Sequence, residues 1–295
     1  MRSRSNSCVK QRKADRSQAL NPERDHRHSK KILYVIGIGP GSPDYLSKRV
    51  YDIFKTVDAV AGYTTYIDLI RPLVKDKHVI SSAMTREIER VQAAIDIALS
   101  GKSCAIVSSG DPGIYAMAGL VLEICKMRKI NVVTPYSRET ALREKATLAV
   151  EIVPGIPALC SGASLLGAPL NHDFAAISLS DLLTPWERIE QRIEAAAKAD
   201  FVIVLYNPKS KRRQRHLETA QKIILKYRDK NTPVGIVVNA MRKGQDVRIV
   251  PLKNLHEATV NMQTTVFIGS STSFEYIDFM ITPRGYGGKY SGDIL

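Results

Sequence analysis

The sequence predicts an α/β fold of two domains, with a parallel sheet in the first and a mixed sheet in the second. From residue 32 to residue 168, continuous apolar runs alternate with amphipathic helical segments, which is typical of a parallel sheet covered by helices. From residue 169 to residue 295, some of the expected strands follow one another closely, which favours a mixed sheet. We expect a ligand to bind in the cleft between these two domains.

Apolar runs and capping residues mark the elements of the first domain. The run Ile32–Gly37 predicts a strand that is buried on both faces. Ser42 followed by proline predicts the start of a helix that continues to about Thr56. Thr85 is the expected cap of a helix with Ile88 on its apolar face, closed by Gly101. The other expected strands are Asp58–Gly62, Lys77–Ser81, Ser103–Ser108 and Ala149–Val153, and the other expected helices are Ala116–Met127 and Ala158–Leu166.

The second domain is expected to contain five strands and two helices. The strands are Phe174–Leu179, Phe201–Tyr206, Pro233–Asn239, Val247–Pro251 and Thr265–Gly269. One helix opens at Thr184 and Pro185, and the spacing of Leu217, Ala220, Ile224 and Tyr227 indicates the other. In the first domain the polar stretch between residues 134 and 147 interrupts the pattern and predicts a surface insertion.

The composition is that of a globular protein with a basic extension. The chain has 295 residues, of which 44% are hydrophobic, and this excludes wholesale disorder. No apolar run approaches the roughly 20 residues that a membrane helix needs. The net charge is +14, and residues 1–31 hold ten Lys and Arg against three acidic residues. We interpret this segment as a disordered basic extension, and the alternative is that it contacts nucleic acid.

The four cysteines favour a reduced, cytoplasmic protein. None of them lies in a spacing typical of a zinc site or an iron–sulfur cluster, so no metal site is expected. Cys104, Cys125 and Cys160 lie in apolar runs and are expected to be small core residues, whereas Cys8 lies in the extension.

Three loops rich in Gly or Pro follow expected strands of the first domain. They are residues 37–41, 108–113 and 153–158. Each alone is a weak signal, but loops that follow parallel strands meet at one edge of the sheet, where ligands bind. Asp111 in the second loop has two interpretations, a ligand contact or a helix cap. A nicotinamide site is disfavoured, because the second strand ends in Gly62 and Tyr63 without the acidic residue that such sites need.

Two further segments of the second domain carry polar groups. Residues 178–186 contain several hydroxyl side chains close to Trp186, the single tryptophan of the chain. This segment is either part of a functional site or a loop with capping residues. Tyr206-Asn207-Pro208 precedes the basic run 209–215, which is suited to carboxylates or phosphates but is more commonly a solvated helix start. Among the histidines, only His172 is a candidate functional residue, because it lies at the expected domain junction.

The ordered motifs of the chain resemble those of a known enzyme family. They are Gly37-x-Gly-Pro-Gly41, Ser109-Gly-Asp-Pro112, Val153-Pro-Gly155 and Pro169-Leu-x-His172. This set resembles the tetrapyrrole (class III) methyltransferases. Within them the chain is similar to the C17-methyltransferases that act on precorrin-3B or cobalt-factor III, and the similarity covers about residues 32–286. The closer likeness rests on residues 62–66, 84–90, 172–174, 178–186, 206–208 and 280–286.

The resemblance implies a methyltransferase of cobalamin biosynthesis that uses S-adenosylmethionine and releases S-adenosylhomocysteine. It implies transfer of a methyl group to C17 of the tetrapyrrole with contraction of the macrocycle, in a cytoplasmic homodimer. The implied donor contacts are Pro40, Ser109, Gly110, Asp111, Ile114, Pro157, Ala158, Tyr206, Asn239 and Ala240. The implied tetrapyrrole trough includes Gly39, Gly41 and His172.

The sequence leaves the catalytic base open. Relatives often have Asp where Ser42 stands, and the nearest acid here is Asp44. We therefore expect Asp44 or a residue of the 178–184 segment to assist proton movement or ring-oxygen chemistry. The candidates in that segment are Ser178, Ser180, Asp181 and Thr184. Arg86 and Arg90, on one face of a helix, are candidate partners for substrate carboxylates, and ordinary surface charge is the alternative for each.

Three rival functions remain at this point. A nucleic-acid-binding module would use the extension and the 209–215 run, but no RRM, KH or zinc-finger pattern supports it. A diphthamide-type or ribosomal-RNA-type methylase would share the fold, and the 178–186 string argues against it. A nicotinamide oxidoreductase is disfavoured by the missing acidic strand end.

Overall fold

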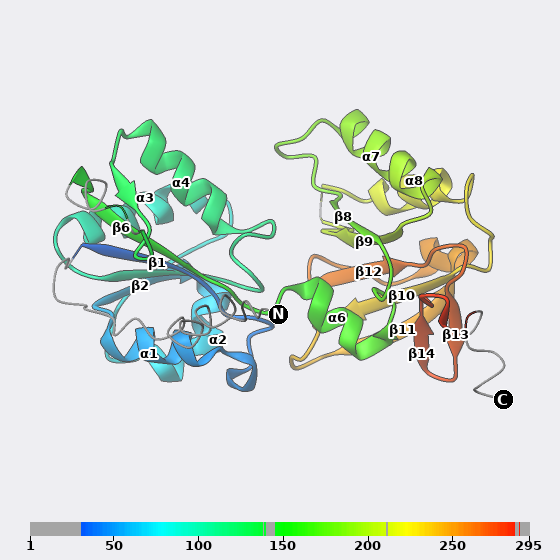
Figure 1. Ribbon diagram of the computed structural model, residues 1–295, viewed down its shortest axis with the longest axis horizontal. Helices are drawn as coiled ribbons and strands as arrows, with labels where there is room; N and C mark the ends of the chain where they lie inside the picture. The colour runs from blue at the N-terminus through cyan, green and yellow to red at the C-terminus, as the bar shows by residue number, and fades with distance from the viewer. Residues whose placement is uncertain (1–30, 138, 140–144, 211, 287–288, 290–295) are drawn as a thin grey trace, which may run out of the picture.

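Two helix-covered sheets lie side by side in the protein (Figure 1). The computed structural model describes residues 31–137, 139, 145–210, 212–286 and 289. The predicted basic extension, apart from Lys31, and the centre of the predicted insertion lie outside these residues. Within the described part of the chain, no helix has the length and apolar character needed to cross a membrane.

The first sheet has six parallel strands in the order β3-β2-β4-β1-β6-β5. Their bounds are β1 (Ile32–Gly37), β2 (Ala59–Tyr63), β3 (His78–Ser82), β4 (Cys104–Ser108), β5 (Val132–Val133) and β6 (Leu148–Val153). Because β1 lies between β4 and β6, the loops that follow these three strands lie next to one another at one edge. The predicted parallel sheet is confirmed.

Helices cover both faces of the first sheet. The helices α1 (Lys48–Thr56) and α2 (Thr64–Val74) lie on one face, and α3 (Glu87–Leu99) and α4 (Met117–Met127) lie on the other (Figure 1). Leu33 and Val35 of β1 pack with the α3 and α4 side, whereas Tyr34 and Ile36 pack with the α1 and α2 side. Both faces of β1 are therefore buried, which explains why its sequence is continuously apolar.

The helix that was expected to begin at Ser42 is divided in two. A short 3-10 turn covers Pro43–Tyr45, and Leu46 then has an extended backbone. The helix α1 begins after Ser47, whose hydroxyl accepts a hydrogen bond from the Val50 amide at 3.4 Å. The second serine therefore caps the helix, and the prediction of one helix from Ser42 to Thr56 is wrong.

The predicted start of α3 is also wrong. Thr85 has a φ of 74°, a left-handed conformation, and its hydroxyl donates to the carbonyl of Met84 rather than capping the helix amides. The helix begins at Glu87, and Ile88 is 59% exposed, so it does not contribute to the core. The predicted closure at Gly101, which has a φ of 96°, agrees with the structure.

The second sheet is mixed, as predicted, in the order β11-β10-β12-β9-β8. Its strands are β8 (Phe174–Ser178), β9 (Val202–Tyr206), β10 (Pro233–Val238), β11 (Asp246–Pro251) and β12 (Thr264–Ile268). Only β8 and β9 pair in parallel. One face is covered by α7 (Trp186–Lys198), α8 (His216–Ile224) and the 3-10 segment η2 (Leu252–Glu257).

The other face of the second sheet is covered by α6 (Ala158–Leu166) and by Met280. Gly162 of α6 lies so close to Phe267 that a Cβ atom there would be 2.6 Å from the ring. After α6, β7 (Gly167–Ala168) pairs with β14 (Phe279–Ile281), which pairs with β13 (Phe274–Tyr276). The domain boundary predicted at residue 168 stays a prediction, and the packing of α6 favours a boundary before that helix.

Two of the three cysteines expected in the core are buried. Cys104 and Cys125 are buried, and burial raises the pKa of the Cys104 thiol to about 12. Cys160 is exposed, so its prediction is wrong. On α6 the neighbouring Leu159 packs into the core beneath the second sheet, and Cys160 lies outside that core. Cys8 lies outside the described residues.

Candidate functional site

The three Gly- and Pro-rich loops meet at the carboxyl edge of β4, β1 and β6, as the sequence predicts. Gly39 and Gly110 exchange two backbone hydrogen bonds, in which the Gly39 amide donates at 3.1 Å and the Gly110 amide at 2.8 Å. Both glycines have a positive φ, of 60° and 69°. This left-handed conformation lets the backbones of two loops pair directly beyond the end of the sheet.

The third loop packs against the other two without room for a side chain. A Cβ atom on Gly155 would lie 2.3 Å from the carbonyl oxygen of Gly110 and 2.6 Å from that of Gly37. A Cβ atom on Gly37 would likewise lie 2.4 Å from the Gly110 oxygen. The loops therefore form one backbone-lined floor, and its shape requires glycine at both positions.

Asp111 joins the second loop to the third. Its carboxylate accepts hydrogen bonds from the Gly113 amide at 2.8 Å and from the Gly155 amide at 3.2 Å. Two interpretations were open for this residue, a ligand contact or a helix cap. The structure gives its side chain a third role, in which it holds the loop after β4 against the loop after β6.

A cavity of about 690 Å³ lies above this floor, between the two sheets. It brings together all ten residues for which the sequence implied donor contacts, together with Gly39. The ten are Pro40, Ser109, Gly110, Asp111, Ile114, Pro157, Ala158, Tyr206, Asn239 and Ala240. Their lining of one cavity is a finding, whereas their contact with a methyl donor stays a prediction.

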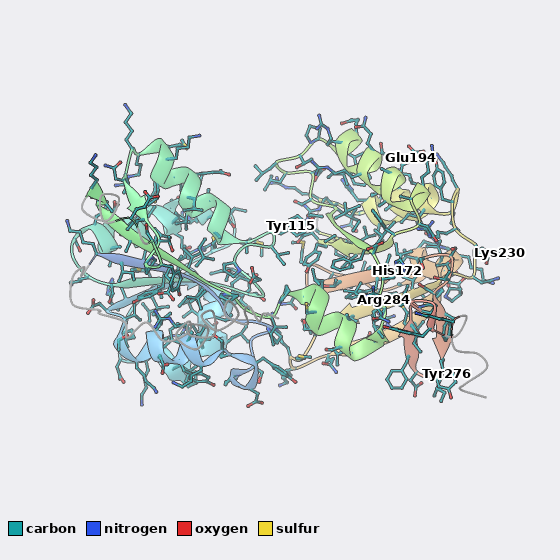
Figure 2. All side chains as sticks on the ribbon, viewed as in Figure 1. Tyr115, His172, Glu194, Lys230, Tyr276 and Arg284 are labelled. Carbon is teal, nitrogen blue, oxygen red and sulfur yellow. The ribbon has the colours of Figure 1, made fainter. Side chains whose placement is uncertain are left out.

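Tyr206 links the second sheet to the first turn of α6. Its hydroxyl accepts a hydrogen bond from the Leu159 amide at 2.9 Å, and burial raises its pKa to about 12. The Tyr115 ring lies 5.2 Å from the Tyr206 ring, and its hydroxyl donates to the carbonyl of Ala176. Figure 2 shows that Tyr115 extends from the first domain toward the second.

Arg242 provides a cation at the cavity that sequence reasoning missed. Its Nε donates to the carbonyl oxygen of Pro40, and its Nη2 donates to Ser109 Oγ at 2.5 Å. Burial lowers its pKa, and the phenol of Tyr66 acts in the opposite direction. An arginine in a turn carries no sequence signal of this kind. Tyr63 and Tyr66 also line the cavity, although sequence reasoning assigned neither of them a role in a site.

A smaller cavity of about 250 Å³ shares Tyr63, Tyr66 and Met84 with the first and also contains Arg90. Arg90 is only 4% exposed, and its Nη1 donates to Ser82 Oγ at 2.6 Å. Arg86, by contrast, has a largely exposed side chain that pairs with Glu89 at 3.4 Å. The two arginines therefore do not present one common surface to a ligand, as their spacing had suggested.

Several predicted site residues do not line the larger cavity. They are Gly41, Asp44, Arg86, Arg90, His172, Ser178, Ser180, Asp181 and Thr184. The exposed Asp44 accepts a hydrogen bond from Ser42. His172 lies within the second domain, away from Tyr115, and its Nδ1 is 3.5 Å from the carboxylate of Asp173 (Figure 2).

The Ser178 hydroxyl and the Asp181 carboxylate of the 178–184 segment already have protein partners. Ser178 Oγ accepts hydrogen bonds from Asn207 Nδ2 at 2.9 Å and from the Ser180 amide at 3.2 Å. Asp181 lies 3.1 Å from His216 Nε2. Ser178 nevertheless borders the site, because its partner Asn207 lines the larger cavity. The catalytic roles of these residues and of Asp44 stay predictions.

The described residues contain no group of three or more His, Cys, Asp or Glu side chains that is arranged to hold a metal ion. The polar groups of the larger cavity are backbone amides and carbonyls, hydroxyls, side-chain amides, two cations and the single carboxylate of Asp111, rather than a cluster of metal ligands. This donor set is suited to an organic ligand that carries anionic groups.

Comparison with known proteins identifies the family. The profile of the family Tetrapyrrole (Corrin/Porphyrin) Methylases matches residues 32–256. The chain belongs to the tetrapyrrole methylase family. The matched region includes the three loops, Tyr206 and Arg242, and therefore most of the cavity lining. The resemblance found in the sequence is confirmed.

Individual relatives cover most of the chain. A cobalt-factor III methyltransferase of Priestia megaterium is 48% identical over 88% of this chain, which spans 46% of that protein. A probable cobalt-factor III C(17)-methyltransferase of Salmonella typhimurium is 44% identical over 86% of this chain and 99% of its own length. The crystal structure of the methyltransferase CobJ superposes with a TM-score of 0.74 at 29% identity, covering 85% of this chain and 99% of that one.

Proposed function

We propose that the protein transfers a methyl group from S-adenosylmethionine to C17 of cobalt-factor III, with contraction of the macrocycle, in cobalamin biosynthesis. One observation carries the proposal. Ten residues that the family resemblance assigned to the donor line a single cavity between the two domains. The near full-length match to the Salmonella protein, which is named for this activity, supports the substrate and the position of methylation.

The cavity fits a donor of this kind in size and chemistry. Its volume of about 690 Å³ lies in the range of small-molecule sites, roughly 300–1,000 Å³. The backbone of Gly110, Pro157 and Ala158 would hold the donor closely, and Tyr206 and Asn239 would form the wall of the second domain. When bound, S-adenosylmethionine supplies a methyl group on a positively charged sulfur, which is intrinsically activated for transfer.

The protein's own contribution is positioning. The paired backbones of Gly39 and Gly110, together with the contacts of Asp111, form the floor of the cavity, and tyrosine rings line its walls. Alignment of two reactants at near-attack distance is worth about 7–11 kcal/mol in favourable cases. A site that works by alignment needs no nucleophilic side chain, in keeping with the cavity lining.

The structure also bears on the rival functions. In the basic run, Lys209 lines the cavity and Arg213 lies 3.8 Å from Asp181, so these side chains serve the protein's own site rather than a nucleic-acid surface. The strand β2 ends in Gly62 and Tyr63, so the acidic residue that binds the ribose in nicotinamide cofactor sites is missing at this position. Both observations favour the methyltransferase.

The proposal includes a homodimer in the cytoplasm. Four large apolar side chains are exposed on the β13–β14 hairpin, namely Phe274, Tyr276, Ile277 and Phe279, at 45%, 60%, 70% and 50%. Figure 2 shows Tyr276 at the outer end of the second domain, away from the cavity between the domains. Such a patch favours contact with a second copy, and size-exclusion chromatography with light scattering tests it.

A turnover assay tests the activity. Purified protein is incubated with S-adenosylmethionine and, separately, with cobalt-factor III and with metal-free precorrin-3B. Mass spectrometry follows the addition of one methyl group, and the absorption spectrum follows ring contraction. We expect product from cobalt-factor III. Product from precorrin-3B alone would show that precorrin-3B, and not cobalt-factor III, is the substrate. Donor binding without any product would contradict the proposed substrate class. Absence of donor binding by calorimetry would contradict the methyltransferase itself.

A further inference from the structure

Arg242 is half-buried, and its partners differ from those of three other buried or half-buried arginines of the described chain. Arg49 is paired with Glu151 at 2.5 Å, Arg90 with Glu87 at 3.9 Å and Arg228 with Asp200 at 3.1 Å. The two partners of Arg242, by contrast, are the carbonyl of Pro40 and the hydroxyl of Ser109, both of which are neutral. Within the part of the chain that the structure describes, no carboxylate lies within ion-pair distance of it.

This arrangement leaves a desolvated positive charge uncompensated. Burial lowers the pKa of Arg242, and the opposing interaction comes from the phenol of Tyr66 rather than from a carboxylate. The nearby Asp111 directs its two oxygens to the amides of Gly113 and Gly155. A half-buried cation without a counter-charge is less well solvated than one in water, and an anionic ligand would offset this cost.

The unused hydrogen-bonding capacity of Arg242 has a definite shape. A guanidinium has five N–H donors in a planar fork. The Nε edge is occupied, since Nε donates to Pro40 and one Nη2 hydrogen donates to Ser109. The opposite edge, formed by Nη1 and the other Nη2 hydrogen, is left with two parallel N–H groups. This is the geometry that binds a carboxylate through both of its oxygens.

The surroundings of Arg242 are apolar and aromatic on one side. Tyr63, Tyr66 and Met84 line both cavities, and Tyr66 interacts electrostatically with Arg242 as well as with Arg90. Ring faces and a thioether beside a cation suit a large flat ligand that has carboxylates at its rim.

We propose that Arg242 binds a side-chain carboxylate of the tetrapyrrole and thereby fixes the orientation of the macrocycle over Tyr63 and Tyr66. This inference rests on the proposed function and deepens it by assigning a substrate-binding residue. The neutral contacts to Pro40 and Ser109 hold the guanidinium in place at the lining of the cavity. Arg242 is thus a specificity residue that two loops of the first domain orient.

Binding measurements on two variants and a control test this assignment. Arg242→Met removes the charge and keeps the stem, and Arg242→Lys keeps the charge but loses the parallel pair of donors. Arg71→Met is the control, since Arg71 is an exposed arginine of α2 that pairs with Asp68. Cobalt-factor III binding is followed by absorption titration, and S-adenosylhomocysteine binding by calorimetry. Circular dichroism checks that each variant is folded.

We expect Arg242→Met to weaken cobalt-factor III binding about 30-fold, the loss typical of a charge-assisted hydrogen-bonded pair, with S-adenosylhomocysteine binding changed less than about threefold. Arg242→Lys is expected to lose about 10-fold, and this variant keeps the test decisive if the methionine variant does not fold. Arg71→Met should bind both ligands as the unmodified protein does.

A second measurement identifies the carboxylate. The monomethyl esters of cobalt-factor III, separated as isomers, are titrated against the unmodified protein and against Arg242→Met. We expect one isomer to bind the unmodified protein about 30-fold more weakly than the free acid and to show no further loss with Arg242→Met. The other isomers should lose affinity with the variant as the free acid does.

Several outcomes would overturn the assignment. Unchanged cobalt-factor III binding by both Arg242 variants would do so, as would an equal loss for every ester isomer. A loss of S-adenosylhomocysteine binding as large as the loss of tetrapyrrole binding would assign Arg242 to the donor carboxylate instead. If the unmodified protein binds the donor but not the tetrapyrrole, this inference fails, whereas the assignment of S-adenosylmethionine as the methyl donor is still supported. If it binds neither, the proposed function fails as well.

Discussion

A methyl group added at Gly155 tests whether the three loops form one rigid unit. In Gly155→Ala the new Cβ atom would lie 2.3 Å from the oxygen of Gly110 and 2.6 Å from that of Gly37. Ordinary contact begins near 3.4 Å, so the loop after β6 must move by about 1 Å. Neither obstacle is a flexible side chain, because both oxygens belong to the backbone of neighbouring loops.

The expected destabilisation is at the upper end of the range for overpacking. Extra methyl groups in well-packed regions cost about 1–3 kcal/mol, and we expect about 3 kcal/mol because the Gly39–Gly110 pairing and the Asp111 contacts resist the shift. For a protein of this size that corresponds to a fall in Tm of roughly 6–12 °C. A displacement of about 1 Å in the floor should also weaken S-adenosylhomocysteine binding at least about 10-fold.

Gly119→Ala is the matched control. Gly119 lies inside α4, and a Cβ atom there would meet nothing within 4 Å. The same substitution at this helix position should stabilise the protein by about 0.5–1 kcal/mol. Thermal unfolding followed by circular dichroism and calorimetric titration with S-adenosylhomocysteine compare the two variants. If Gly155→Ala matched the unmodified protein in both measurements, the close-packed floor would be refuted.

Three further predictions concern buried polar groups. The Cys104 thiol releases its proton near pH 9 in the unfolded chain and near pH 12 in the folded one. Between these pH values the folded state therefore binds more protons, and the free energy of unfolding should fall by about 1.4 kcal/mol per pH unit. Urea unfolding at several pH values should show a weaker dependence of this free energy on pH in Cys104→Ala. Glu151→Gln leaves the Arg49 guanidinium without its partner and should destabilise the protein by about 3 kcal/mol in urea, and a change below about 0.5 kcal/mol would contradict the buried pair. Tyr206→Phe removes the hydroxyl that accepts a hydrogen bond from the Leu159 amide, and the free energy of unfolding in urea should fall by about 1–2 kcal/mol. The variant should also lose the phenol that titrates near pH 12.

The features that sequence reasoning predicted well have local causes. A continuous apolar run followed by glycine or proline identifies both a buried strand and the loop after it, so the loops at residues 37–41, 108–113 and 153–158 could be placed at one sheet edge. The range of α6 was also predicted, since Pro157 precedes a regular apolar pattern and Gly167 follows it. In each case the signal lies within a few residues of the structure that it specifies.

The features that were missed depend on contacts between distant residues. The strands β7 and β14 have two and three residues, too few to show a period, and they form because Gly167 and Met280 come side by side in the fold. Arg242 is recognisable only from its contacts with Pro40 and Ser109, about 200 and 130 positions earlier in the chain. Thr85 was missed for a local reason instead, because its left-handed backbone directs the hydroxyl to the carbonyl of the adjacent Met84.

The two walls of the cavity are held in different ways, and this difference bears on ligand entry. The floor is fixed within the first domain by paired backbones and by Asp111. The wall of the second domain reaches it through single polar contacts, such as Arg242 to Ser109 and Tyr115 to Ala176, and through the chain before α6. Interfaces made of few polar contacts permit relative motion of domains. We therefore expect a tetrapyrrole to enter by separating contacts of this kind, among them also Arg242 to Pro40, whereas the loops that position the donor keep their shape.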